Sequence, residues 1–351
     1  MPTLQTAIRL IVLGAAFLVF FSCISQPPTT DKPHHTPKGF KNIYTDEANR
    51  FWDFIKWRRE RAGKDIPGAE SYNFPLADNN PDRLKRNREQ QTLTWIGHAT
   101  LLLQMQGLNI LTDPHFSKRA SPVQWAGPER AAPLGMALED LPPIDIVVIS
   151  HDHYDALDTQ SIRKLHRRPG GDKTRFYVPL GLKRWFARQG IERVIEMDWW
   201  DRQADQSLEI IAVPTQHWSK RSLFSANESL WSGWVIASGT YRFIFVGDTG
   251  YAPFFKEIGE KLGPFDLAAI PIGAYEPRWF MSRHHVNPEE SVQIHMDIGS
   301  RQSVGIHWGT FILTDEPLDE PPKRLAAALK QNRIAREDFF VLRHGETITL
   351  E

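Results

Sequence analysis

The sequence predicts an α/β fold in which β-sheets are covered by helices. Three observations lead to this prediction. Short runs of apolar and β-branched residues, typical of β-strands, recur from Thr92 to the end of the chain. The early runs follow one another as hairpins, whereas most of the later ones alternate with helical segments. Polar side chains come directly after several runs, as is common where loops leave the edge of an α/β sheet.

The composition is that of an ordinary globular protein. The chain has 351 residues, of which 41% are hydrophobic and 24% charged, which is enough for one large domain or two smaller ones. Lys plus Arg and Asp plus Glu number 42 each, so no overall charge favours nucleic acid as a partner. The single cysteine, Cys23, means that the chain does not rely on internal disulfides.

Residues 1–22 have the pattern of an export signal. An arginine precedes the apolar run LIVLGAAFLVFF, whose 12 residues are too few to span a bilayer but typical of a signal-peptide core. The following Ser22 and Cys23 resemble a bacterial lipoprotein cleavage site, although Phe20 and Phe21 depart from its usual pattern. We expect an exported protein of the bacterial cell envelope that faces the periplasm. It would be held at the membrane as a lipoprotein through Cys23 or by an uncleaved anchor.

Two segments separate this signal from the predicted sheets. Residues 23–40 are rich in Pro and Thr and indicate a linker, in which His34 and His35 are expected to be solvated. Residues 41–91 form an N-terminal extension, polar and loop-like in its second part. Within it, residues 46–60 have apolar side chains at helical spacing and acidic residues near the start. We expect a helix packed on the next domain or, alternatively, one whose aromatic and basic face touches lipid.

The elements of the main domain, residues 92–351, are predicted in order. Residues 92–113 form three strands with a turn near Gln106, and the continuous apolar run 144–150 indicates a strand buried on both faces. Asn287 is expected to cap a helix, with Pro288 at its first position. Further strands are predicted at 174–179, 193–197, 208–214, 265–273, 302–309 and 338–346, a hairpin at 232–248, and helices at 157–168, 180–190, 287–299 and 320–331.

Four polar clusters follow predicted strands. They are His151, His153 and Asp155 after residues 144–150, His217 after 208–214, Asp248 at the end of the hairpin 232–248, and His307 within 302–309. Loops at the carboxyl ends of strands are positioned by a rigid scaffold, so these groups can converge. Imidazoles and carboxylates without thiolates suit Zn, Mn or Fe. A single histidine after a strand is most often structural, so the metal-site prediction depends on all four clusters together.

The same residues and their flanking segments resemble a known family. HDHYD, the later His217, Asp248 and His307, and long segments such as LTDPHFSKRASPVQWAGP and GPFDLAAIPIGAYEPRWFM are similar to the metallo-β-lactamase superfamily. Within it, the match is closer to the phospholipases D that hydrolyse N-acylphosphatidylethanolamine. The resemblance covers most of residues 92–346. It implies the metallo-β-lactamase fold, an αββα four-layer sandwich with a pair of zinc ions at the edge of two facing sheets.

The resemblance also implies a role for each candidate residue. The first metal would be bound by His151, His153 and His217, the second by Asp155 and His307, and both by a bridging Asp248. His285 matches a family histidine beside the substrate head group, so it would bind substrate or transfer a proton, unless it only precedes a helix. Asp155, Asp248 and His285 are thus the expected catalytic residues. Asp113, Asp158 and His98 would orient ligands without being ligands.

The chain departs from the family at Ala156. The family has a histidine here that binds the second metal, whereas alanine has no donor atom. Asp155, Asp248 and His307 with water would remain, which is still a workable catalytic site. We therefore expect one tight zinc site and a weaker second one, with loss of the second metal as the alternative.

The implied reaction is metal-assisted hydrolysis of a phosphodiester by a hydroxide that the metal makes available near neutral pH. N-acylphosphatidylethanolamine would give phosphatidic acid and an N-acylethanolamine. The HxKxxxxD motif of the other phospholipase D class is absent, so no covalent phosphohistidine is expected. The alternatives are a hydrolase of the same fold that acts on another phosphodiester, ester or lactone, and a non-catalytic metal-binding protein. The expected partners are a phospholipid substrate and a membrane surface, and not nucleic acid.

Overall fold

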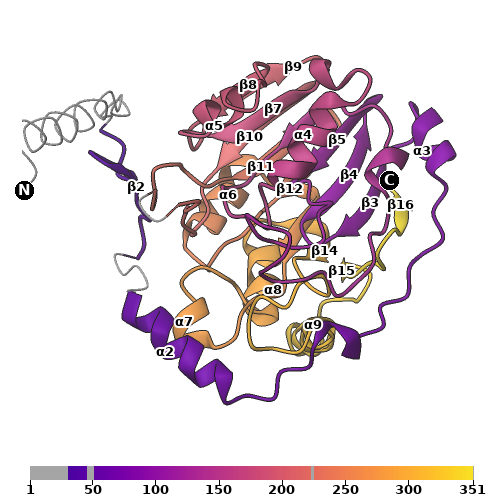
Figure 1. The fold of residues 1–351 in the computed structure, drawn as a ribbon. Helices are drawn as coiled ribbons and strands as arrows, with labels where there is room; N and C mark the ends of the chain where they lie inside the picture. Colours follow the sequence, from indigo (N-terminus) through magenta and orange to yellow (C-terminus); the bar gives the residue numbers. More distant parts are fainter. Residues whose placement is uncertain (1–30, 46–50, 223–224, 351) are drawn as a thin grey trace, which may run out of the picture.

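Two seven-stranded β-sheets face each other in the computed structural model, and helices cover their outer faces (Figure 1). The expected four-layer αββα arrangement is thus confirmed. The structure describes residues 31–45, 51–222 and 225–350. The predicted signal segment and Cys23 lie outside these residues. Within the described ranges, no helix is both long enough and apolar enough to span a bilayer.

The first sheet has the strand order β16-β3-β4-β5-β6-β7-β8. Strands β3 to β5 pair antiparallel as hairpins, and β5 to β8 pair parallel through crossovers, as the order of hairpins and helices in the sequence predicts. The short edge strand β16 was not predicted. The strands are β3 (Thr92–Gly97), β4 (Thr100–Met105), β5 (Leu108–Thr112), β6 (Ile146–Val148), β7 (Arg175–Pro179), β8 (Val194–Met197) and β16 (Thr347–Thr349).

The second sheet has the order β15-β14-β13-β12-β11-β10-β9. Its antiparallel part runs from β9 to β12, and its parallel part from β12 to β15. The predicted hairpin is the pair β11 and β12, closed by a hydrogen bond from Ser238 N to Tyr241 O. The strands are β9 (Arg202–Asp205), β10 (Leu208–Val213), β11 (Gly233–Ala237), β12 (Arg242–Phe245), β13 (Phe265–Pro271), β14 (Ser300–Ile306) and β15 (Phe339–Phe340).

Helices seal the outer face of each sheet with an apolar layer. On the first sheet these are α4 (Thr159–Arg167) and α5 (Lys183–Ala187). On the second they are α6 (Phe254–Leu262), α8 (Pro288–Asp297) and α9 (Glu320–Asn332). The predicted capping box of α8 is present, with Asn287 and Glu290 each accepting a hydrogen bond from the backbone of the other. The remaining helical segments are α2 (Phe51–Ala62), η1 (Ala69–Ser71), α3 (Pro81–Arg86), η2 (Leu138–Asp140), η3 (Gly171–Lys173) and α7 (Arg278–Met281).

A third apolar layer fills the space between the two sheets. Trp95 from the first sheet and Trp234 from the second are both fully buried in it. Trp231 is also almost completely buried, in a smaller apolar cluster. Because this layer fixes the distance between the sheets, it also fixes how loops from the two sheets meet at their common edge.

The prediction that His34 and His35 are solvated is wrong. His34 Nε2 lies 2.7 Å from Asp198 Oδ1, and His35 Nε2 lies 2.9 Å from Asp198 Oδ2. Because a carboxylate only accepts, both imidazoles donate to it. Lys32 donates to the same carboxylate, and His34 stacks on Trp199 with 4.2 Å between ring centroids. Burial alone would raise the pKa of Asp198, but the bonds from His34 and Lys32 hold it below its usual range. The two strands that follow, β1 (His35–Thr36) and β2 (Gly39–Phe40), pair with each other.

Candidate metal centre

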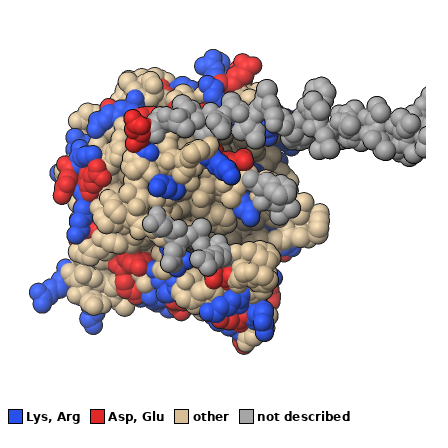
Figure 2. All heavy atoms as spheres, turned by 90° about the vertical axis from the view of Figure 1, so that its left-hand side faces the viewer, with Lys and Arg blue, Asp and Glu red and all other residues tan. Residues whose placement is uncertain are grey.

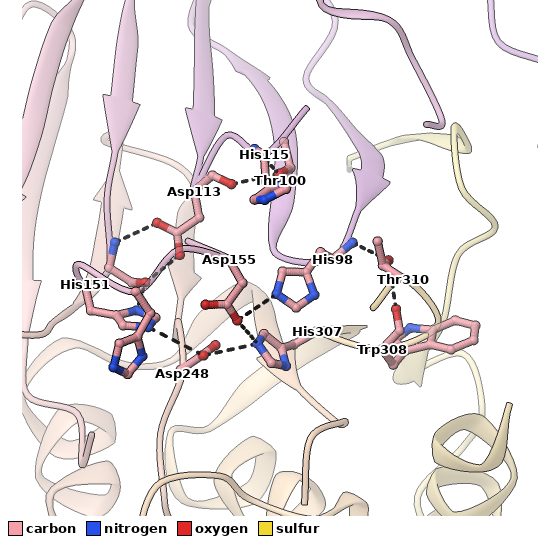
Figure 3. Close-up of polar contacts among 12 residues, drawn as sticks. His98, Thr100, Asp113, His115, His151, Asp155, Asp248, His307, Trp308 and Thr310 are labelled. Atoms are coloured by element: carbon pink, nitrogen blue, oxygen red, sulfur yellow. Dashed lines mark hydrogen bonds and ion pairs between the residues drawn. The ribbon is translucent and has the colours of Figure 1, made fainter. Parts of the chain in front are cut away.

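The predicted ligand residues come together at one edge of the two sheets, and Figure 3 shows four of them, His151, Asp155, Asp248 and His307. The loop after β6 carries three of them, and the loops after β10, β12 and β14 each carry one. Four segments that are far apart in the sequence therefore supply one group of side chains. The convergence that the sequence predicts is observed. These residues are His151, His153, Asp155, His217, Asp248 and His307.

Three imidazoles form the first cluster. The potential ligand atoms of His151, His153 and His217 all lie within 4.8 Å of one another. His217 Nε2 is 3.1 Å from His153 Nδ1, and the rings of His151 and His217 stand 4.5 Å apart. Asp248 Oδ2 faces this cluster, 3.7 Å from His151 Nε2 and 3.9 Å from His217 Nε2. Three nitrogens and one carboxylate oxygen thus surround a common point.

Hydrogen bonds behind the first cluster leave its inner nitrogens free to bind a metal. His217 Nδ1 lies 2.9 Å from the carbonyl oxygen of His284, so Nδ1 carries the proton and Nε2 keeps its lone pair. His151 Nδ1 lies 2.8 Å from Ser150 Oγ, whose own hydroxyl donates to Asp113. The inner Nε2 of His151 is buried and has no hydrogen-bond partner among the described residues. Such an orphaned nitrogen, aimed at other donors, fits a metal ligand.

The second cluster lies beside the first and contains His98, Asp155 and His307. Asp155 Oδ2 is 3.2 Å from His98 Nε2 and 3.3 Å from His307 Nε2. Asp248 Oδ2 is 3.1 Å from His307 Nε2. The same oxygen of Asp248 thus faces both clusters, which is the position of a bridging ligand (Figure 3).

Burial and the two carboxylates set the charges of the centre. Burial and the neighbouring His153 lower the pKa of His151 to about 3, so this imidazole is neutral at pH 7. Burial opposes charge on Asp155 and Asp248, but His307 holds the pKa of both well below the usual range. Burial also acts to lower the pKa of His307, yet the two carboxylates raise it to about 10. Without a metal, His307 therefore keeps a proton between the two carboxylates. A neutral His151 and ionised carboxylates, without thiolates, are donors that suit divalent transition metals.

His285, the predicted substrate-side histidine, lies next to both clusters. Its ring centroid is 5.1 Å from that of His217 and 5.5 Å from that of His307. Its Nδ1 is buried without a hydrogen-bond partner among the described residues. Burial lowers the pKa of His285 to about 3, so it is a neutral imidazole at the edge of the centre.

The three residues predicted to orient ligands differ in what they contact. Asp113 acts on His151 through Ser150, as described above. Asp158 instead caps α4, accepting from the backbone of Gln160 and Ser161, and so holds the end of the loop that carries the first ligands. His98 is itself a member of the second cluster, which the sequence reasoning missed. The signal was present, because His98 follows β3 just as the other candidates follow their strands.

Comparison with known proteins agrees with this geometry. Residues 108–308 match the model of the β-lactamase superfamily domain. An N-acyl-phosphatidylethanolamine-hydrolysing phospholipase D from Caenorhabditis elegans is 46% identical over 257 residues, which cover 70% of each chain. The mitochondrial protein of the same name from Saccharomyces cerevisiae is 36% identical over 239 residues, covering 66% of this chain and 50% of the yeast protein.

A solved structure shows the same fold. A metallo-hydrolase from the archaeon Ignicoccus hospitalis superposes with a TM-score of 0.57 at 21% identity, covering 75% of this chain and 99% of the archaeal one. At this identity the likeness concerns the fold alone. The domain match, the two more similar relatives and this shared fold all agree with the family resemblance of the sequence motifs. The chain therefore belongs to the β-lactamase superfamily and is a metal-dependent hydrolase of the metallo-β-lactamase fold.

Proposed function

We propose that the protein is a zinc-dependent phospholipase D that hydrolyses N-acylphosphatidylethanolamine to an N-acylethanolamine and phosphatidic acid. The observation that carries the proposal is the pair of adjoining donor clusters that share Asp248. A paired centre of this kind suits an in-line displacement, in which both the attacking and the leaving oxygen need stabilisation. The identity to relatives named for this activity supports the substrate.

The first cluster would hold one zinc ion, and the second cluster a further ion with Asp248 between them. Nitrogen and oxygen donors of this kind are those that catalytic zinc sites use. When bound, zinc supplies a water acidic enough to act as the nucleophile near neutral pH and positive charge beside the phosphoryl oxygens. The chain itself keeps the ligands in place, since Ser150 and the His284 carbonyl fix the tautomers of His151 and His217.

His285 would act on the substrate head group. As a neutral imidazole, it can donate a hydrogen bond through one nitrogen and accept one through the other. Its position beside His217 and His307 suits contact with a phosphoryl oxygen or with the leaving oxygen. No side chain has to form a covalent bond to phosphorus.

Hydrolysis of N-acylphosphatidylethanolamine by the zinc-loaded protein tests the proposal. We expect release of N-acylethanolamine by the parent protein and none above background by the His151→Ala variant. Hydrolysis of another phosphodiester, an ester or a lactone, but not of this lipid, would favour a different metallohydrolase of the same fold. Bound zinc without turnover of any of these compounds would favour a non-catalytic binding protein.

Helix α2 supports a membrane-facing orientation of the enzyme. Trp57 anchors the helix by stacking on Phe280 of α7, with 5.2 Å between ring centroids. Phe51 and Trp52 on its other side are 69% and 73% exposed. Three further residues of the helix, Lys56, Arg58 and Arg59, are basic, whereas Arg61 is paired with Asp315 beside Trp57. Exposed aromatic and basic residues on one helix favour a surface of anionic lipid, and N-acylation leaves the phospholipid substrate anionic.

The position of α2 relative to the metal centre agrees with a lipid substrate. Helix α2 contacts α7, and the chain that leaves α7 reaches His285 four residues later. Figure 2 shows the face to the left in Figure 1, with uncharged side chains in its middle and charged ones around them. We propose that this face meets the membrane. The predicted export segment, with Cys23 at its end, would bring the enzyme to the bacterial envelope.

Removing the exposed aromatic side chains should weaken binding to lipid. The double variant Phe51→Ser, Trp52→Ser is expected to bind vesicles of phosphatidylcholine and phosphatidylglycerol at least about tenfold more weakly, because two large apolar groups are lost. Co-sedimentation with the vesicles measures this. The control is Met296→Ser, which removes an exposed apolar side chain from α8 and should leave binding unchanged. Equal binding by the double variant and the parent would contradict a role of α2 at the membrane.

A further inference from the structure

We infer that His98 is a metal ligand and completes the second site, a role that Ala156 cannot fill. The inference rests on the proposed metal centre. It makes His98 a ligand, whereas the sequence predicted only that His98 orients other ligands. Ala156 is buried, with 3% of its surface exposed, and its methyl group has no donor atom. Without another ligand, the second site has only Asp155, His307 and the shared Asp248.

The side chain of His98 lies where a fourth ligand is needed. Its Nε2 is 3.2 Å from Asp155 Oδ2, which is in turn 3.3 Å from His307 Nε2, and His307 Nε2 is 3.1 Å from Asp248 Oδ2. Atoms about 2.0–2.1 Å from one zinc ion at tetrahedral angles lie about 3.3 Å from one another. The spacings thus match those between ligands of one ion. Two nitrogens and two oxygens make up a four-coordinate donor set.

The backbone holds His98 in register with His307. The backbone N–H of His307 donates to the carbonyl of His98 over 3.0 Å, and the two rings stand 4.0 Å apart. Thr310 Oγ1 accepts from the backbone N–H of His98, and Trp95 Nε1 donates to its carbonyl. The loop after β3 is thereby tied to the loop after β14, so the second site is assembled from both sheets.

Backbone strain marks the same two residues. His98 and His307 have positive φ angles, 55° and 60°, which are strained for a residue with a side chain and persist only where the surrounding structure imposes them. In each case the strained backbone turns an imidazole toward Asp155 (Figure 3).

A simpler role for His98 is a hydrogen bond that orients Asp155. The two roles predict different metal contents, because glutamine can keep an N–H donor but is a poor zinc ligand. A metal ligand can also be replaced by a second histidine from another position, whereas an orienting residue cannot. Ala156 lies next to Asp155 in the chain, so the Ala156→His substitution would offer such a replacement donor.

Metal content per chain and the visible spectrum of the cobalt(II)-loaded protein test the inference. The parent should bind about two zinc ions per chain. His98→Ala and His98→Gln should bind about one, with the affinity of the second site lowered at least about 100-fold, because even residues behind the ligands contribute 10–100-fold. In the cobalt form, the absorption contributed by the second ion should be lost while that of the first remains. The double variant His98→Ala, Ala156→His should regain the second ion.

The controls separate a lost ligand from a damaged fold. His115 is also buried, and its ring contacts Phe311 as that of His98 does, but it lies outside both clusters. His115→Ala should therefore keep two ions. Two ions with unchanged affinity in His98→Gln, or a parent with one ion, would overturn the inference. Since lipid is not part of the measurement, a protein that binds two ions through His98 but does not cleave N-acylphosphatidylethanolamine would contradict only the proposed function.

Discussion

The Asp248→Asn variant is expected to lose about 10³-fold or more in turnover of its phosphodiester substrate, measured as kcat at saturating zinc. Asp248 Oδ2 faces both clusters, 3.7 Å from His151 Nε2 and 3.1 Å from His307 Nε2. Asparagine keeps the shape of the side chain but removes the negative charge between the two proposed metal sites. Loss of a single preorganised electrostatic contact costs about 10²–10³-fold in kcat, and Asp248 contributes to two sites at once.

The local packing holds the backbone at position 248 in place, so this substitution tests the charge of the side chain alone. Gly247 precedes Asp248 with a φ angle of 67°, and a Cβ on it would lie 2.7 Å from Cβ of Ser150. The backbone that carries Asp248 is therefore held against the loop of the first cluster, and an isosteric change should not move it. Asp266→Asn, on the surface end of β13, is the matched control and should keep full activity. An Asp248→Asn enzyme within tenfold of the parent would show that the two sites do not act through this residue.

The candidate site was predictable because its signals are local and its assembly follows from the sheets. Each candidate ligand residue follows a strand whose apolar pattern is evident, and parallel strands end at a common edge. His34 and His35 show the opposite case. Their surroundings are polar and proline-rich, and their burial depends on Asp198, far along the chain, so no pattern near them indicates it.

Long-range pairing explains the other differences between prediction and structure. Strand β16 has only three residues, and its pairing with β3 joins the two ends of the domain, so its existence depends on a partner about 250 residues away. His98 was expected to orient ligands because the family resemblance implies only that role for it. Only the approach of the β3 and β14 loops, set by the packing of the two sheets, brings His98 to Asp155.

The packing between the two sheets leads to the second large predicted effect, a loss of stability when the side chain of Trp234 is truncated. Its side chain is fully buried between the sheets, and Trp234 Nε1 donates to the carbonyl of Ile149 over 2.8 Å. Ile149 lies two residues before His151. Trp234→Ala should lower the free energy of unfolding by about 3–5 kcal/mol, the range for truncating a large aromatic side chain in a core. Urea denaturation of the metal-free protein measures this without the contribution of bound zinc.

Two further variants separate the lost volume from the lost hydrogen bond. Trp234→Phe keeps most of the ring but leaves the carbonyl of Ile149 without its donor, so a loss of about 1–3 kcal/mol is expected. Trp125 is 83% exposed, and Trp125→Ala should change the free energy of unfolding by no more than about 0.5 kcal/mol. If Trp234→Ala were as mild as Trp125→Ala, the layer between the sheets would not be what stabilises the fold. The geometry of the metal centre would then have to be explained by its loops alone.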